Sequence, residues 1–273
     1  MARFGGRIGS IPPVVLNLLI LNALLYFGTY LLSNTGIDLV KSLALYYPGS
    51  ELFRPHQLVT HMFMHGGTMH LFFNMFALWM FGKVLEQVWG PKRFLIYYFV
   101  TGLGAAALHL LVMHLQLGSL AGDAKALVNT MSPEGFAIFV RDNFPEFSVR
   151  LSSFIEQWNN QPNAPQYIAQ AESYVGDMIN LKKNVPTIGA SGAVFGVLLA
   201  FGMLFPNTRL VLLFPPIPIK AKWFVIGYGV IELVSGLANQ TGDNMAHFAH
   251  LGGMIFGFIL IKYWNKTKRN RFY

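Results

Sequence analysis

Two segments far apart in the sequence carry side chains that could act together as a nucleophile and a base. Ser191 lies in a Gly-Ala-Ser-Gly segment, and His250 lies in an Ala-His segment near the end of the chain. A serine hydroxyl needs an adjacent base to take its proton before it becomes a strong nucleophile. If the chain folds so that the two segments meet, Ser191 and His250 could therefore form a catalytic pair.

Other polar side chains lie in or beside apolar runs of the sequence. They are His61, His65, His70, Asn74, Glu86, Glu232 and His247. Polar groups in such surroundings are unfavourable and are usually functional or paired. The histidines leave a second enzyme class open, because imidazoles can also bind zinc. Against that alternative, the chain contains no His-Glu-x-x-His segment, which zinc peptidases use for two ligands and a base.

The composition indicates a membrane protein. Hydrophobic residues make up 53% of the 273 residues, only 12% are charged, and the mean hydropathy is +0.44. A soluble domain has about twice that charged share. The formal charge of +8 in so apolar a chain indicates anchoring at a cytoplasmic membrane face, not nucleic-acid binding. With no cysteine in the sequence, disulfides and thiolate catalysis are excluded.

Six apolar runs are candidates to cross a hydrocarbon core of about 30 Å. They cover residues 14–32, 70–88, 94–115, 188–205, 223–237 and 245–264. Residues 116–186 differ, because seven acidic residues occur there among Lys and Arg. This polar segment predicts an extramembrane loop, with small amphipathic helices at 136–140 and 167–179.

Lys and Arg set the expected orientation, because they are enriched in short cytoplasmic loops. With six spans, both termini lie on one side, and that side collects 13 of the 20 Lys and Arg residues. We therefore expect cytoplasmic tails at 1–13 and 265–273, on either end of a membrane domain at 14–264. The loop at 116–186 would then face outward.

Helix geometry places Ser191 and His250 at similar depth. At ~1.5 Å per residue, Ser191 lies roughly 22 Å from the end of its run at Pro206, and His250 lies roughly 18 Å from Lys262. Both runs also carry glycines four residues apart, a spacing that lets helix backbones approach closely. These glycines are Gly192 and Gly196 in the fourth run, and Gly253 and Gly257 in the sixth.

Three segments, in order along the chain, resemble motifs of the rhomboid family of intramembrane serine proteases. They are Gly189-Ala190-Ser191-Gly192 with Gly196, Ala249-His250 with Gly253 and Gly257, and His61-x-x-x-His65 through His70-x-x-x-Asn74. The resemblance covers the chain apart from residues 116–186. It implies an all-α bundle of six transmembrane helices, in which a short fourth helix carries the nucleophile.

The resemblance also implies roles for the matched residues. Ser191 would be the nucleophile and His250 its base, in a dyad without a carboxylate. No Asp or Glu lies on the sixth span to orient His250, and Asp243 in the preceding loop is not expected to act directly. His70, Asn74 and the backbone N–H of Ser191 would form the oxyanion hole, whose donors stabilise developing negative charge.

Further expectations follow from the same resemblance. Supporting roles in packing would fall to Gly189, Gly192, Phe195, Gly253 and Gly257. Neither a metal nor another cofactor is implied. The substrates would be transmembrane proteins within the lipid bilayer, and the expected location is a bacterial inner membrane.

The sequence departs from many rhomboid proteases at Phe195, where those relatives carry a Tyr packed against the catalytic His. A Phe ring preserves the packing but lacks the hydroxyl. Two functions without proteolysis stay open: a rhomboid-like protein that binds membrane clients, and a small transporter whose polar residues line a path. Rhomboid-like proteins that bind clients without cleaving them typically lack the Ser or the His, whereas this chain has both.

Overall fold

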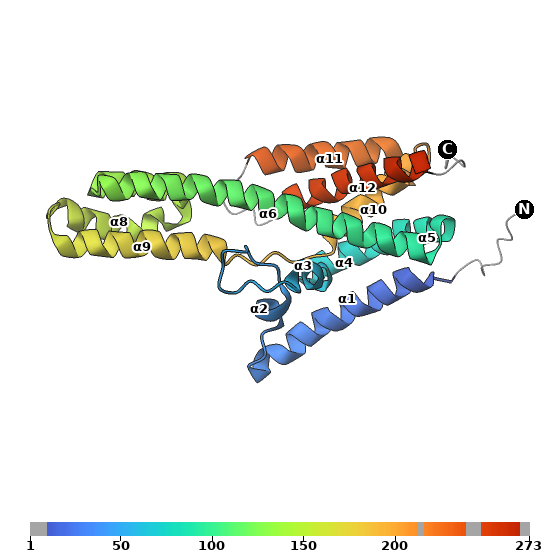
Figure 1. Ribbon diagram of the computed structural model, residues 1–273, viewed down its shortest axis with the longest axis horizontal. Helices are drawn as coiled ribbons and strands as arrows, with labels where there is room; N and C mark the ends of the chain where they lie inside the picture. The colour runs from blue at the N-terminus through green and yellow to red at the C-terminus, as the bar shows by residue number, and fades with distance from the viewer. Residues whose placement is uncertain (1–9, 212–215, 239–246, 268–273) are drawn as a thin grey trace, which may run out of the picture.

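The computed structural model describes residues 10–211, 216–238 and 247–267 as an almost entirely helical chain (Figure 1). The α-helices are α1 (Pro13–Leu32), α2 (Leu39–Leu43), α3 (Gln57–Thr60), α4 (Thr68–Ala77), α5 (Lys83–Trp89), α6 (Pro91–Asn129), α7 (Pro133–Asn143), α8 (Ser148–Asn159), α9 (Pro165–Lys183), α10 (Ser191–Leu204), α11 (Ala221–Ala238) and α12 (His247–Thr267). Shorter elements are η1 (Ser33–Thr35), η2 (His61–Phe63), η3 (Leu78–Gly82), η4 (Pro145–Phe147), and the antiparallel strands β1 (Arg209–Val211) and β2 (Pro218–Lys220). The prediction of an all-α fold is confirmed.

Several helices are long and apolar enough to cross a membrane. Within the described residues, the segments that meet this test are Pro13–Thr35, Thr68–Trp89, Pro91–Asn129 and Ala221–Ala238. The helix that begins at Ser191 is also apolar but has 14 residues, in keeping with the predicted short fourth helix. The chain is therefore an integral, multi-pass membrane protein. The start of α1 and the end of α12 lie at the same end of the bundle (Figure 1).

A buried carboxylate joins the first helix to the second apolar segment. The backbone N–H groups of Val14 and Val15 donate to the carboxylate of Glu86 at 3.0 and 2.8 Å. These groups belong to the first turn of α1, which Pro13 opens, and a helix leaves such N–H groups without partners of its own. Negative charge is also favoured at a helix N-terminus. Glu86 therefore holds the start of α1 against α5.

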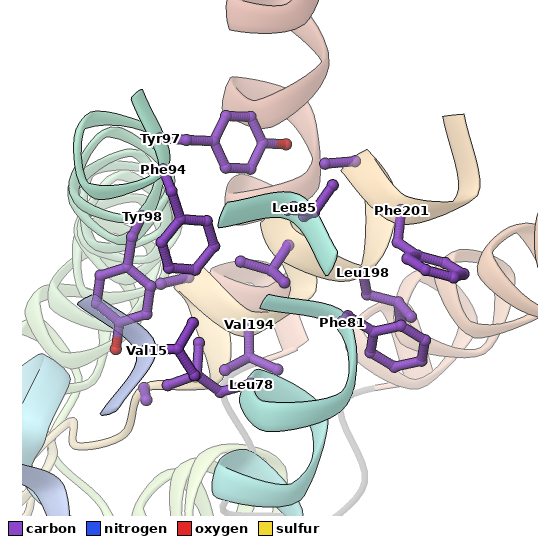
Figure 2. Close-up of a cluster of buried hydrophobic side chains, with 14 of the residues drawn as sticks. Val15, Leu78, Phe81, Leu85, Phe94, Tyr97, Tyr98, Val194, Leu198 and Phe201 are labelled. Carbon is purple, nitrogen blue, oxygen red and sulfur yellow. The ribbon is translucent and has the colours of Figure 1, made fainter. Parts of the chain in front are cut away.

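The short helix α10 lies at the centre of the bundle. It contacts α6 and α12 extensively, and it also touches α4, α5 and α11. Its apolar side chains Val194, Leu198 and Phe201 are part of a buried cluster that includes residues of α1, η3, α5 and α6 (Figure 2). The element that carries Ser191 is thus packed on several sides.

The third apolar run ends near residue 115, but the helix that contains it does not end there. α6 continues to Asn129 and has 39 residues, which corresponds to about 58 Å at 1.5 Å per residue. A hydrocarbon core of about 30 Å cannot contain that length. The apolar run ends at Gln116, but the following Gln, Leu, Ala and Lys residues favour helix, so the helix projects beyond the bundle (Figure 1).

Residues 116–183 form a subdomain at the end of α6, which we call the projecting subdomain. Here α7 and α9 fold against the last turns of α6, and α8 packs against α7 (Figure 1). The subdomain has its own apolar cluster, in which Phe136 and Trp158 are fully buried. The small helices expected at 136–140 and 167–179 are present as parts of α7 and α9, whereas α8 was not expected from the sequence.

Candidate active site

Ser191 is the first residue of α10, and the chain turns sharply just before it. Gly189 has a φ of +133°, which glycine adopts without the strain that a side chain would create. A Cβ at Gly189 would also lie 2.9 Å from Nε2 of His70. The backbone N–H of Gly189 donates to the carbonyl of His61 at 2.9 Å. The turn therefore brings Ser191 against η2 and the start of α4.

Ser191 and His250 meet across the interface of α10 and α12. Nε2 of His250 lies 2.8 Å from Oγ of Ser191, within the 2.6–3.2 Å over which a base typically takes a hydroxyl proton. His250 is buried and Ser191 is half-buried. The pair thus combines an imidazole held by packing with a hydroxyl that a substrate can approach.

Phe195 restrains the plane of the His250 ring. The two rings are stacked, with centroids 4.2 Å apart and planes that differ by 3°. Phe195 follows Ser191 by four residues, so both side chains lie on one face of α10. The ring packing expected at this position therefore exists without the hydroxyl of a tyrosine.

Glycines allow α10 and α12 to touch close to the pair. A Cβ added at Gly253 would overlap the carbonyl group of Gly192, so the two backbones are in contact here. The spacing predicts that both glycine pairs join these helices, but Gly196 and Gly257 have a different partner. A Cβ at either position would press on Thr101 of α6, which shows that one glycine of each pair packs against α6.

A carboxylate reaches His250 from the neighbouring helix α11. Oε2 of Glu232 lies 2.9 Å from Nδ1 of His250 and 2.6 Å from Nδ1 of His247. The expectation of a histidine without a neighbouring carboxylate is wrong, because it considered the sixth span alone. The available signal was Glu232 itself, an ionisable residue in an apolar run. Asp243 lies outside the described residues.

The positions of Glu232, His247 and His250 also test whether the histidines form a zinc site. Among the described residues, Glu232, His247 and His250 are the group whose ligand atoms are close enough to share a metal ion, and His61, His65 and His70 are not part of it. In a tetrahedral zinc site with bonds of ~2.0–2.1 Å, ligand atoms lie about 3.3 Å apart. Separations of 2.6 and 2.9 Å are hydrogen-bond distances instead. The geometry favours a hydrogen-bonded cluster.

His70 and Asn74, the predicted oxyanion donors, lie one turn apart on α4. His70 is next to the pair, because a Cβ at Gly189 would lie 2.9 Å from His70 Nε2 and 3.4 Å from Ser191 Oγ. Asn74 is buried, and its side-chain amide donates to the carbonyl of His70 at 2.9 Å. An amide NH₂ carries two N–H groups, so this bond uses one of them. The structure thus brings His70 to Ser191, and the Asn74 side chain is bonded to the backbone of His70.

His61 lines a small cavity beside Ser191, together with Thr187, Ala105 and Gly102. Its Nδ1 donates to the carbonyl of Gln57 at 2.8 Å. Burial lowers the pKa of His61 to about 4, so the imidazole is neutral at pH 7. A cavity with polar groups in its wall can hold water, which is the second reactant of a hydrolysis.

Taken together, the residues can perform nucleophilic catalysis. Ser191 supplies the nucleophile, His250 can accept its proton, and His70 lies where a donor could face a developing oxyanion. The N–H groups at the start of α10 would also stabilise an oxyanion there, because a helix N-terminus favours negative charge.

Comparison with known proteins identifies the family to which the chain is related. The sequence matches the Rhomboid domain over residues 52–132 and 163–266. It is 26% identical over 221 residues to "RHOMBOID-like protein 12, mitochondrial" of Arabidopsis thaliana, which covers 80% of this chain and 48% of that protein. It is 24% identical over 260 residues to "Rhomboid-like protein 16, chloroplastic" of the same plant, with coverage of 95% and 63%.

A shorter match, 38% identical over 82 residues, relates the chain to "Rhomboid protein 1, mitochondrial" of Saccharomyces cerevisiae and covers 30% of this chain and 23% of that protein. The chain spans about half to two thirds of the length of the two plant relatives. The matched Rhomboid ranges leave out residues 133–162, which contain α7 and α8 of the projecting subdomain. Because the domain match includes most of the chain and the fold is an all-α membrane bundle, this protein belongs to the rhomboid family.

Proposed function

We propose that the protein is an intramembrane serine protease, which hydrolyses peptide bonds in or near transmembrane segments of other membrane proteins. The observation that carries the proposal is the 2.8 Å contact between Nε2 of His250 and Oγ of Ser191, at the start of a helix inside a membrane bundle. Membership of the rhomboid family supports a serine protease. The family also includes proteins that bind clients without cleaving them. The presence of both members of the pair favours the protease.

In the proposed reaction, Oγ of Ser191 attacks the carbonyl carbon of the substrate while Nε2 of His250 takes the hydroxyl proton. The oxyanion would accept hydrogen bonds from the backbone N–H of Ser191 and from His70 and Asn74, donors of the kind that stabilise tetrahedral intermediates. The C–N bond then breaks as His250 returns the proton to the leaving nitrogen. Water, with His250 again as the base, hydrolyses the acyl ester and restores Ser191.

The test uses the purified chain in proteoliposomes with a single-span substrate. Ser191→Ala and His250→Ala should each lower cleavage by at least about 1,000-fold, as for other members of a nucleophile–base pair, and should leave the protein folded by gel filtration and thermal shift. Ser33→Ala and His114→Ala are matched controls, because Ser33 bonds to the carbonyl of Tyr30 and His114 bonds to Tyr47, and none of these residues belongs to the proposed site. Cleavage at the wild-type rate by pure Ser191→Ala would overturn the proposal.

A fluorophosphonate probe separates the protease from the two alternatives without proteolysis. A working nucleophile should form a covalent adduct on Ser191, detected by intact mass and peptide mapping, and the adduct should vanish in Ser191→Ala. A client-binding protein or a transporter would not be labelled. Treatment with a chelator should leave cleavage unchanged, whereas loss of cleavage would favour the zinc alternative.

For the location, we propose that both termini face the side rich in Lys and Arg, which is the cytoplasm for a bacterial inner membrane. The absence of cysteine makes a direct test possible. Single cysteines at Ser152 in the projecting subdomain and at Asn265 near the end of α12 should react with an impermeant maleimide from opposite sides of a sealed vesicle. Reaction of both from the same side would contradict the proposed topology.

A further inference from the structure

One face of α11 is turned toward the start of α12 and carries a single carboxylate. A Cβ at Gly229 would contact Met254, and a Cβ at Gly236 would contact His247 and Phe248. Glu232 lies between these glycines at helical spacing, so it shares their face. The glycines let α11 approach α12 closely, and Glu232 is the side chain that enters the space between them. It is 4% exposed.

Glu232 bridges two histidines through one oxygen atom. Its Oε2 lies 2.6 Å from Nδ1 of His247 and 2.9 Å from Nδ1 of His250. The first contact is a hydrogen bond. The second contact is as short as a hydrogen bond, but its atoms are not aligned as in one. Within the described chain, the buried Nδ1 of His250 has no hydrogen-bond partner. A small rotation of the ring or the carboxylate would align this N–H with the oxygen.

A buried carboxylate in a membrane helix needs strong partners, because burying an unpaired charge is highly unfavourable. Both partners here are imidazoles, and one of them is the proposed base. Its other nitrogen, Nε2, contacts Ser191. Ser191, His250 and Glu232 therefore lie in the order of a nucleophile, a base and a group that orients the base.

We propose that Glu232, itself held by His247, is a positioning residue for His250. This inference rests on the proposed protease function. By accepting the proton at Nδ1, Glu232 would fix the tautomer in which the Nε2 lone pair faces Ser191, and its charge would stabilise the imidazolium that forms when Ser191 loses its proton. His247 would keep the carboxylate from turning away. The reacting atoms remain those of Ser191, His250, the substrate and water.

The main test compares Glu232→Gln with Glu86→Gln. Both remove a buried carboxylate of the bundle, but Glu86 binds backbone N–H groups of α1. We expect Glu232→Gln to lower kcat and the rate of fluorophosphonate labelling by up to about 10,000-fold, the loss seen when a catalytic histidine loses its orienting carboxylate. KM should stay within about twofold. Glu86→Gln should lower the thermal midpoint and leave kcat close to wild type.

The pH profile of kcat/KM supplies a readout that a structural role would not move. Without the charge of Glu232 the imidazolium form of His250 is less stable, so the acid limb should move to lower pH. The other titratable groups that face or approach His250 are His247 on α12, His70 on α4 and His109 on α6. His70→Gln and His109→Gln should leave the acid limb closer to wild type than Glu232→Gln does.

Two further measurements test the role of Glu232 if Glu232→Gln does not fold. His247→Gln retains the carboxylate and should lower kcat by about 3- to 30-fold, less than loss of Glu232. In ¹⁵N-histidine spectra of the wild type, His250 should carry its proton on Nδ1, and a proton on Nε2 would overturn the proposal. Failure of the wild type to label at Ser191 would defeat the proposed function. Wild-type kinetics in folded Glu232→Gln would defeat this inference alone.

Discussion

The membrane bundle and the projecting subdomain are both helical, but they differ in what they bury. Within the described chain, the buried polar and charged side chains all lie outside residues 116–186; they are Asn22, Gln57, His61, His65, Asn74, Glu86, Thr101, Glu232 and His250. The subdomain core is apolar and rich in aromatic rings, with Phe136 and Trp158 at its centre. Among the described residues, the buried polar and charged side chains thus belong to the bundle.

The difference follows from the two solvents. Burial of aromatic rings from water stabilises the subdomain through the hydrophobic effect. Between helices in lipid that driving force is missing, and close packing of small residues with polar contacts takes its place. The Gly192–Gly253 contact and the Glu86 contacts with α1 are of this kind. Equal substitutions in the two regions should therefore have unequal effects.

The largest effect is expected where the helices of the bundle touch. Gly253→Ala places a Cβ on the carbonyl of Gly192 and must separate α10 from α12, so cleavage should fall by at least about 100-fold, since small displacements of reacting groups have effects of this size. Gly122→Ala is the matched control, because its Cβ would meet no atom within 4 Å. It should leave activity unchanged and slightly raise the thermal midpoint. Equal effects of the two substitutions would contradict the comparison.

The next effect concerns the donors on α4. His70→Ala and Asn74→Ala should each lower kcat by about 10- to 1,000-fold without abolishing cleavage, the range for loss of part of an oxyanion hole. Steady-state kinetics on the single-span substrate provides the measurement. Wild-type kcat in both variants would move the oxyanion role to other groups.

A smaller effect is expected at the ring that stacks on His250. Phe195→Ala removes a contact of the type worth ~0.5–1.5 kcal/mol beyond its area, so labelling of Ser191 should slow by about 3- to 10-fold. Phe195→Tyr keeps the ring and should label at close to the wild-type rate. Full activity of Phe195→Ala would show that stacking does not restrain the imidazole.

The smallest effect on chemistry is expected from the projecting subdomain. A short polar linker in place of most of residues 118–183 should leave labelling of Ser191 within about twofold of wild type, because the buried polar groups of the site lie elsewhere. Cleavage of particular substrates can change through access. The linker must leave 186–189 intact, because Gly189 bonds to His61 there. A deletion variant that folds but cannot be labelled would make the subdomain part of the site.

The sequence predicted the class of fold and the residues that meet at Ser191 better than it predicted their surroundings. Ser191, His250 and Phe195 follow from local motifs and helical spacing. Glu232 was missed as a partner of His250 because contact between different helices depends on how they pack, which spacing along one helix cannot give. The same limit applies to Gly196 and Gly257, whose spacing indicates close packing but not that the partner is α6.

The continuation of α6 past the apolar run was missed for another reason. The apolar run stops at Gln116, and hydropathy marks where lipid contact ends, not where hydrogen bonding along a helix ends. The residues that follow retain helix propensity and pack on α7 and α9, so the helix continues to Asn129.

Because α6 is one continuous helix, it fixes both the rotation of the subdomain about the helix axis and its height, which is its distance from the bundle along that axis. Each residue added between the bundle and the subdomain turns the subdomain by about 100° and lifts it by ~1.5 Å. Seven residues make nearly two full turns, so they restore the original facing to within about 20° while lifting it by roughly 10 Å. An insertion of seven residues in α6, with a matching insertion in α9, which runs back beside α6 (Figure 1), would therefore change the height of the subdomain with little change in its rotation. The length of α6 thus sets both the rotation of the subdomain about the helix axis and its distance from the bundle.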